Sequence, residues 1–289
     1  MIKTKLDINS NDNSLFVTAQ CNNRCLMCSQ PPLKRNDVEI LFEKNLLVLD
    51  SAPIELKDIG ITGGEPTLLG EKLFDLIELI KCKLPETQIH ILSNGRAFAN
   101  RDYTKELARV GGDKLLLGVP LHSDYSYDHD QITQVGKSYV ETMKGLYNLA
   151  EFGIKIELRI VITKINFNRL YTLSNFIYKN LPFVSYISFM GLEDTGYAIK
   201  NHEIVWVNPG EYQIQLEKAV INLSIWGMDV SVFNLPHCCL PLSLHEFARK
   251  SISDWKVKYL SGCEKCKMKN DCCGLFSTSK KELEITPKF

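Results

Sequence analysis

The chain has 289 residues and a balanced charge, with 34 basic and 34 acidic residues and a formal net charge of zero. This balance argues against a dominant nucleic-acid-binding face. No apolar run is long enough to cross a bilayer and the first residues lack a signal core, so we expect a cytoplasmic protein without a membrane partner. The chain has ten cysteines; because disulfides are reduced in the cytosol, grouped cysteines indicate metal binding.

Apolar, strand-like runs alternate with helical patterns through the first two thirds of the chain. The expected strands are 15–18, 58–62, 88–92, 115–120, 154–162 and 184–189, and the expected helices are 38–49, 71–84, 102–110, 138–152 and 169–180. Regular alternation of this kind produces parallel strands with right-handed helical crossovers. We therefore predict an α/β fold, a partial (β/α)6 TIM-type barrel at residues 10–200, with reactive residues at the carboxyl ends of its strands.

The alternation changes after residue 200. Asn208 and Pro209 are typical of a helix cap and first turn, and they predict a helix at 211–226. A short strand at 229–233 and a helical stretch at 244–250 follow. We predict that residues 201–289 form a small, cysteine-rich C-terminal domain on the open side of the barrel.

Cys21, Cys25 and Cys28 lie in one loop after the first expected strand, spaced by three residues and then by two. Three thiolates can hold three irons of a 4Fe–4S cube. No fourth cysteine lies nearby, so the fourth iron would stay open for a substrate or cofactor, whereas a structural metal site is usually closed. A zinc knuckle or chance clustering is the alternative interpretation.

A second motif, Gly63-Gly64-Glu65-Pro66, follows the second expected strand. Together with the cysteine spacing it resembles the radical S-adenosylmethionine superfamily. The resemblance implies that the open iron binds S-adenosylmethionine and that reductive cleavage yields a 5′-deoxyadenosyl radical, which abstracts hydrogen from a substrate. It also implies that this run holds the amino group of the cofactor. From the residues alone, the run is equally typical of a tight turn capped by Glu65.

Polar residues after the third and fourth strands are further cofactor candidates. Ser93 and Asn94 resemble the family's polar turn and would bond ribose or carboxylate oxygens, although an ordinary Asn-Gly turn is the alternative. Ser123 is a candidate for a cofactor contact, and its neighbours His122 and Asp124 are candidates for facing the substrate.

Two more candidates lie in the fifth and sixth strands. Arg159 interrupts an apolar strand, and a buried guanidinium needs an anionic partner. That partner is either the cofactor carboxylate or a barrel acid in a structural ion pair. Met190 and Gly191 end the sixth strand, where they are expected to contact adenine.

The C-terminal cysteines form a second ligand-like set. Cys263, Cys266 and Cys272 have the spacing of the auxiliary-cluster segment of radical enzymes that modify peptides, and Cys238 or Cys239 would supply the fourth ligand. We choose Cys238, Cys263, Cys266 and Cys272 as ligands of a second 4Fe–4S cluster. Zinc in the same four thiolates is the alternative, because a closed four-thiolate site suits both metals.

Residues 21–32, and residues 251–256 with the cysteine segment that follows, resemble the smaller radical maturase of the His-Xaa-Ser peptide system. This family has an auxiliary-cluster C-terminus of the SPASM/twitch type. The resemblance implies a ribosomally made peptide substrate, a partner maturase and an electron donor such as flavodoxin or ferredoxin. In that family a single cysteine replaces the pair at 238–239 and Cys-Gly-Gly replaces 272–274, which favours Cys238 and Cys272. A radical enzyme acting on a small molecule, nucleotide or RNA is the runner-up, and a zinc-stapled binding protein without catalysis is a third interpretation.

Overall fold

The structure is a computed structural model that describes residues 5–10, 12–280, 283 and 285. In these ranges, seven strands form one sheet in chain order: β1 (Ser14–Phe16), β2 (Asp58–Thr62), β3 (Gln88–Leu92), β4 (Leu115–Pro120), β5 (Lys155–Val161), β6 (Tyr186–Met190) and β7 (Val230–Phe233). Every strand pair with a described register in this sheet is parallel. The fold is therefore the predicted α/β architecture of a partial TIM-type barrel, followed by a cysteine-rich C-terminal region.

Helices connect the strands as the periodicity predicts. They are α1 (Val38–Asp50), α2 (Glu71–Lys83), α3 (Arg101–Gly111), α4 (Ser126–Thr133), α5 (Ser138–Glu151), α6 (Leu170–Asn180), α7 (Tyr197–Lys200), α8 (His202–Val205) and α9 (Pro209–Ile225). The sequence prediction did not include α4, α7 or α8, which are short. α9 begins with the expected cap, because the Asn208 side chain accepts the Gly210 N–H and Pro209 occupies the first turn.

Two predictions beyond residue 200 need correction or extension. The helical stretch expected at 244–250 is present as a 3-10 helix that begins and ends earlier, at Leu242–Phe247. It does not continue as a helix because the Arg249 N–H donates to the Val232 carbonyl at 2.9 Å, which attaches this segment to β7. The short strand expected at 229–233 is present, and it pairs with β6 as part of the main sheet.

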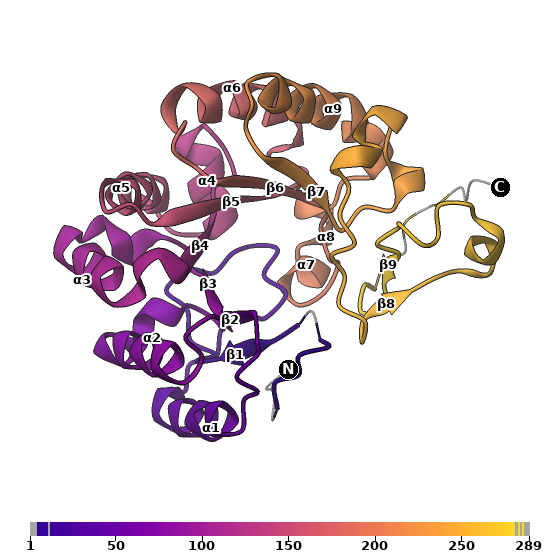
Figure 1. The fold of residues 1–289 in the computed structure, drawn as a ribbon. Coiled ribbons are helices and arrows are strands. Elements are labelled where there is room, and N and C mark those ends of the chain that lie inside the picture. Colours follow the sequence, from indigo (N-terminus) through magenta and orange to yellow (C-terminus); the bar gives the residue numbers. More distant parts are fainter. Residues whose placement is uncertain (1–4, 11, 281–282, 284, 286–289) are drawn as a thin grey trace. The chain divides into compact units, whose positions relative to one another are not determined.

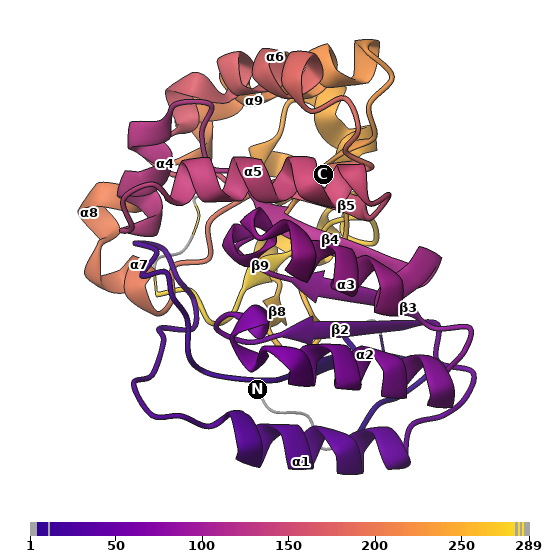
Figure 2. The same ribbon diagram turned by 90° about the vertical axis from the view of Figure 1, so that its left-hand side faces the viewer.

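The chain divides into two compact units. The first comprises residues 1–24, 30–120 and 135–157 and contains β1 to β4. Isoleucines 59, 61, 89 and 91 on β2 and β3 are fully buried, and α1, α2 and α3 run side by side along these strands (Figure 2). Because β2 and β3 are parallel, the loops that follow them lie at the same edge of the sheet.

The second unit comprises residues 25–29, 121–134 and 158–289. α6 and α9 pack against each other and cover β6 and β7 (Figure 1). The C-terminal segment forms a small antiparallel hairpin from β8 (Val257–Lys258) and β9 (Leu275–Phe276). The division at residue 200 into a barrel and a C-terminal domain stays a prediction.

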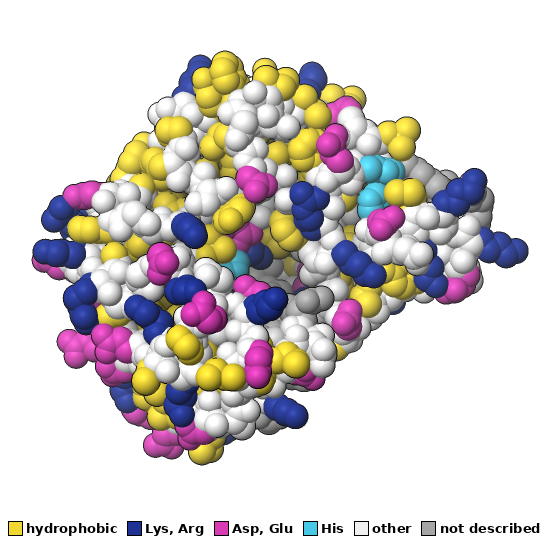
Figure 3. Space-filling model, viewed as in Figure 1, with side chains coloured by type: hydrophobic (Ala, Val, Ile, Leu, Met, Phe, Trp, Pro, Cys, Tyr) yellow, Lys and Arg dark blue, Asp and Glu magenta, His cyan; other side chains and the backbone are white. Residues whose placement is uncertain are grey.

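On the face shown in Figure 3, basic and acidic side chains alternate over the N-terminal elements, and no extended basic patch is visible among the described side chains. The described helices include none with the length and apolar character needed to span a bilayer.

Candidate active site

The segment that leads into the first cysteine is held by a buried aspartate in the first unit. Asp37, which precedes α1, accepts the Thr18 hydroxyl at 2.8 Å and the Ala19 N–H at 3.1 Å. The Asp37 side chain stands at the N-terminus of α1 but makes no capping bond to that helix. It instead fixes the chain just before Cys21, a role that the local sequence pattern did not reveal.

Gly63 and Gly64 pack directly on this same segment. A Cβ atom at Gly63 would lie 2.4 Å from the Thr18 carbonyl oxygen, and one at Gly64 would lie 2.0 Å from the Gln20 carbonyl oxygen. The two chains are also hydrogen-bonded, from the Gly64 N–H to Thr18 at 2.7 Å and from the Glu65 N–H to Gln20 at 2.8 Å. The glycines therefore permit close contact between the loop after β2 and the cysteine loop.

Glu65 is fully buried and joins two loops. One carboxylate oxygen accepts the Thr67 N–H at 3.1 Å, the Thr67 hydroxyl at 2.7 Å and the Ser93 hydroxyl at 2.7 Å. The other accepts the Asn94 N–H at 2.7 Å. Glu65 also caps the 3-10 turn Pro66–Leu69, as the structural interpretation of the motif predicted. Burial raises the pKa of Glu65, while its hydrogen bonds oppose that rise.

We expect Glu65→Gln to destabilise the protein by about 1–3 kcal/mol, because the amide NH2 would face the Asn94 N–H, donor to donor, in a buried site.

The effect of Glu65 on stability also depends on pH, with a defined sign. Since the folded pKa is above the ordinary 4.5, protonation stabilises the folded wild type below that pH, and this stabilisation is lost as pH rises through the folded pKa. The difference in the free energy of unfolding between the wild type and Glu65→Gln should therefore decrease as the pH rises from 4.5 through the folded pKa of Glu65. Urea unfolding of both proteins between pH 4.5 and 8 measures it, and a pH-independent difference would contradict the raised pKa.

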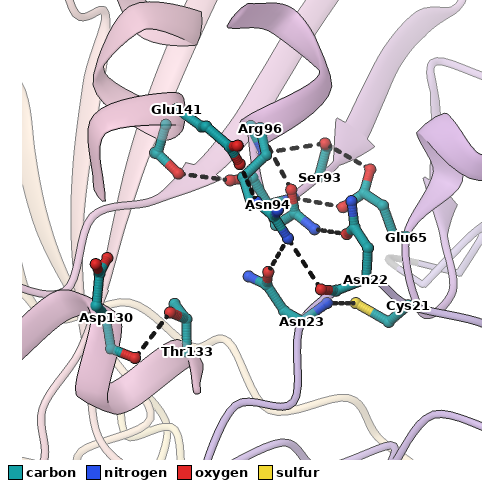
Figure 4. Close-up of polar contacts among 12 residues, drawn as sticks. Cys21, Asn22, Asn23, Glu65, Ser93, Asn94, Arg96, Asp130, Thr133 and Glu141 are labelled. Carbon is teal, nitrogen blue, oxygen red and sulfur yellow. Dashed lines mark hydrogen bonds and ion pairs between the residues drawn. The ribbon is translucent and has the colours of Figure 1, made fainter. Parts of the chain in front are cut away.

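The polar turn after β3 contacts the cysteine loop itself. Asn94 donates through its amide to the Asn22 side-chain oxygen at 2.6 Å. Arg96 donates to the Asn22 carbonyl at 2.9 Å and to the Asn23 side-chain oxygen at 2.8 Å, as Figure 4 shows. Sequence reasoning selected Ser93 and Asn94 but missed Arg96. The only local signal was its position immediately after the turn.

Cys25 and Cys28 belong to the second unit, where three other segments hold the loop between them. The Leu26 N–H donates to the Ile132 carbonyl at 2.9 Å, and the Asn201 side chain donates to the Leu26 carbonyl at 2.8 Å. Gly196 is at φ +60°, and a Cβ there would lie 2.4 Å from the Cys28 carbonyl oxygen. Met27, in the position before the third cysteine, is buried in an apolar cluster with Ile132, Ala198 and Val205.

The loop after β4 is organised by its own polar contacts. Ser123 is fully buried; its hydroxyl donates to Asp128 at 3.4 Å and accepts the Tyr125 N–H at 3.1 Å. Asp124 forms an ion pair with the Arg169 guanidinium at 2.6 Å, which attaches the loop after β4 to the start of α6. Burial, with a smaller contribution from His129, lowers the pKa of His122 to about 3, so His122 is neutral at physiological pH.

The remaining barrel candidates lie on β5, at the end of β6 and directly after it. Arg159 is on β5 and is partly exposed, and its carbonyl accepts the Leu121 N–H at 3.2 Å. Met190 ends β6, and the Gly191 N–H donates to Phe233 on β7 at 2.9 Å. Gly191 has no room for a side chain, because a Cβ would lie 2.7 Å from Leu235.

Four of the six C-terminal cysteines line one pocket of about 410 Å³ in the second unit. These four are the residues chosen from the sequence: Cys238, Cys263, Cys266 and Cys272. Cys239 is buried and does not line the pocket, and Cys273 packs into an apolar cluster with Ile252 and Phe276. His237 also lines the pocket, and its Nδ1 is buried without a hydrogen-bonding partner.

The thiols at 272 and 273 differ in their chemistry. A hydrogen bond from the Cys273 thiol lowers the pKa of Cys272 to about 5, and the Gly274 N–H and His237 assist. The same contact, together with burial, raises the pKa of Cys273 above its ordinary range. Metal ligands are thiolates, so Cys272 is the better donor of the pair.

The donor sets suit iron and zinc, which thiolates bind. Among the described residues, no three histidine, cysteine, aspartate or glutamate side chains stand together as a ready-made metal site. The fit therefore rests on the chemistry of the donors. Cys21, Cys25 and Cys28 are all partly exposed, and none of the ten cysteines forms a disulfide.

Comparison with known proteins identifies the class. The family model described as the radical SAM superfamily matches residues 15–177, which is more than half of the chain. The chain therefore belongs to the radical SAM superfamily and is an enzyme of that class. Membership implies a 4Fe–4S cluster and S-adenosylmethionine as cofactors.

The chain is also similar to particular proteins. The chain is 29% identical to a GTP 3′,8-cyclase from Campylobacter jejuni subsp. doylei over 265 residues, which is 86% of this chain and 77% of that protein. Its fold resembles anSMEcpe with bound AdoMet and the Cp18Cys peptide, with a TM-score of 0.63, 16% identity and coverage of 94% and 91% of the two chains. It also resembles Streptococcus suis SuiB bound to S-adenosylmethionine, with a TM-score of 0.60 and 15% identity; this match covers 80% of the chain but 50% of SuiB.

Proposed function

We propose that Cys21, Cys25 and Cys28 hold an open 4Fe–4S cluster and that the chain cleaves S-adenosylmethionine to start radical chemistry. The observation that carries this proposal is the bonding of the loops after β2 and β3 to the residues on either side of Cys21. When bound and reduced, the cluster and its cofactor supply a 5′-deoxyadenosyl radical that abstracts hydrogen from the substrate.

The protein residues have separate roles in this proposal. Gly63 and Gly64 bring their loop against the cysteine loop, and Glu65 joins that loop to Ser93 and Asn94. The backbone carbonyls of the Gly63–Pro66 run, with Ser93, Asn94, Ser123, Arg159, Met190 and Gly191, are the candidate contacts for S-adenosylmethionine. Met27 shields the cysteine loop with an apolar side chain, which limits access of water.

We further propose that the substrate is a ribosomally made peptide and that Cys238, Cys263, Cys266 and Cys272 hold an auxiliary 4Fe–4S cluster in a SPASM/twitch-like region. The shared pocket of these four cysteines supports the second cluster. The fold likeness to anSMEcpe, whose structure holds a peptide, supports the substrate class. A partner maturase and an electron donor such as flavodoxin or ferredoxin complete the proposal.

We expect Cys272→Ala to remove about four irons per chain and to leave the first cluster reducible, because one ligand of a closed cube is lost. The matched variant Cys273→Ala should keep its iron, since Cys273 packs among apolar side chains outside the pocket. Metal analysis and electron paramagnetic resonance (EPR) of anaerobically reconstituted protein measure both. Loss of one zinc in place of four irons would assign the C-terminal site to zinc. Equal iron and equal zinc in both variants would exclude Cys272 as a ligand.

A nucleotide substrate is the second candidate, and the similarity to the GTP 3′,8-cyclase favours it. The two candidates are separated by adding GTP or a candidate precursor peptide to reduced, reconstituted enzyme and measuring formation of 5′-deoxyadenosine above the background. Stimulation by the peptide with mass change of the peptide supports the proposal. Stimulation by GTP with its consumption would replace the peptide with a nucleotide.

A further inference from the structure

The Arg96 guanidinium is the centre of a hydrogen-bonded arrangement around the first cysteine of the loop. Its Nη1 donates to the Asn22 carbonyl at 2.9 Å and to the Asn23 side-chain oxygen at 2.8 Å. Its Nε donates to Glu141 on α5 at 2.5 Å. The Arg96 side chain is only 15% exposed, and its bonds to Asn23 and Glu141 are partly buried, whereas its bond to the Asn22 carbonyl lies at the surface.

The contacts of Arg96 fix the peptide that follows Cys21. The Asn23 N–H points to the Cys21 sulfur, with an N–S distance of 3.3 Å, and Asn23 is 3% exposed. Asn94 holds the neighbouring Asn22 side chain at 2.6 Å. Figure 4 shows these residues converging on the segment at Cys21. The orientation of this N–H therefore depends on Arg96 and Asn94 in the turn after β3.

An N–H donor to a cluster-ligating sulfur and a nearby positive charge both stabilise the more negative, reduced cluster. Hydrogen bonds to sulfur and net charge are two of the factors that set iron–sulfur reduction potentials. Arg96 supplies the charge and orders the donor. Glu141 partly neutralises that charge, and water screens it only in part, because its side chain is 43% exposed.

We propose that Arg96 is a positioning residue for the iron–sulfur site, which fixes Asn22 and Asn23 so that the Asn23 N–H points to Cys21 and which thereby raises the reduction potential of the cluster. This inference rests on the proposed function, because it requires Cys21 to be a cluster ligand. It adds a residue that none of the recognised motifs contains.

The test is a redox titration of the reconstituted protein followed by EPR. Arg96→Gln should lower the ratio of reduced to oxidised cluster about tenfold at a fixed potential. This change corresponds to a downward shift of the reduction potential by about 59 mV for one electron. Arg96→Lys, which keeps the charge but has a single donor group, should give an intermediate value. Arg101→Gln is the matched control. Arg101, on α3, pairs with Glu151, which lies on the same helix α5 as Glu141, and it does not contact the cysteine loop. Equal potentials for Arg96→Gln and Arg101→Gln would overturn the inference.

A second variant keeps the test decisive if Arg96→Gln does not load a cluster. Glu141→Gln removes the counter-charge and leaves the donors of Arg96 to the loop in place, so the potential should shift upward. A loaded Glu141→Gln protein with an unchanged or lower potential would overturn the inference alone. A wild-type protein whose cluster signal does not respond to S-adenosylmethionine would overturn both the inference and the proposed function.

Discussion

Replacing Cys25 with alanine is expected to abolish formation of 5′-deoxyadenosine. An open cube is held by only three thiolates, and a chain with two of them leaves two irons without protein ligands. The remaining loop contacts, such as the bond from Leu26 to Ile132, do not replace a metal ligand. The measurement is quantification of 5′-deoxyadenosine and methionine by chromatography after anaerobic reduction, together with iron analysis.

Cys82→Ala is the matched control for this substitution. Cys82 is exposed on α2 and lies in neither cysteine set. This variant should retain wild-type iron content and cofactor cleavage. If Cys25→Ala continued to produce 5′-deoxyadenosine at the wild-type rate, the assignment of the open iron site to Cys21, Cys25 and Cys28 would be wrong.

Gly64→Ala should destabilise the protein by about 3 kcal/mol and also reduce its iron content. The added Cβ would lie 2.0 Å from the Gln20 carbonyl oxygen and 2.5 Å from its carbon. These are backbone atoms, and the hydrogen bond between the Glu65 N–H and Gln20 at 2.8 Å opposes their separation. Relief of the overlap therefore requires the cysteine loop to shift, at the cost typical of overpacked sites.

Urea unfolding and iron analysis test this prediction, with Gly136→Ala as the control. A Cβ added at Gly136 would meet no atom within 4 Å, and this residue has no positive φ, so its substitution should change stability by less than about 0.5 kcal/mol. A Gly64→Ala protein that is as stable as Gly136→Ala and loads normal iron would show that the loop after β2 does not need this close approach.

Much of the fold was predictable because its signals are local. Strands such as β2 and β3 have buried isoleucines at every second position, and a period of two identifies a strand within five residues. The ends of these strands agree with the prediction. The short helix α4 was missed because eight residues contain few periodic positions. The 3-10 helix Leu242–Phe247 ends before the predicted boundary because the Arg249 N–H bonds to β7.

The sequence by itself determined the chemical class of this protein. Three cysteines within eight residues carry their ligand spacing in the chain, so no tertiary information is needed to recognise an iron–sulfur motif. The same holds for the Gly63–Pro66 run after its strand. The cysteine pairs at 238–239 and 272–273 are also visible in the sequence, and the family resemblance favoured Cys238 and Cys272.

Only the tertiary structure decided how these motifs are held together. Glu65 bonds to Ser93 and Asn94, which lie 28 and 29 residues away, and Arg96 bonds to Asn22 and Asn23, which lie more than 70 residues away. The structure also places Cys272 in the lining of the pocket and Cys273 in an apolar cluster. Contacts of this kind arise when parallel strands bring their following loops to one edge of the sheet, so they depend on packing between distant segments and leave no periodic trace in the chain.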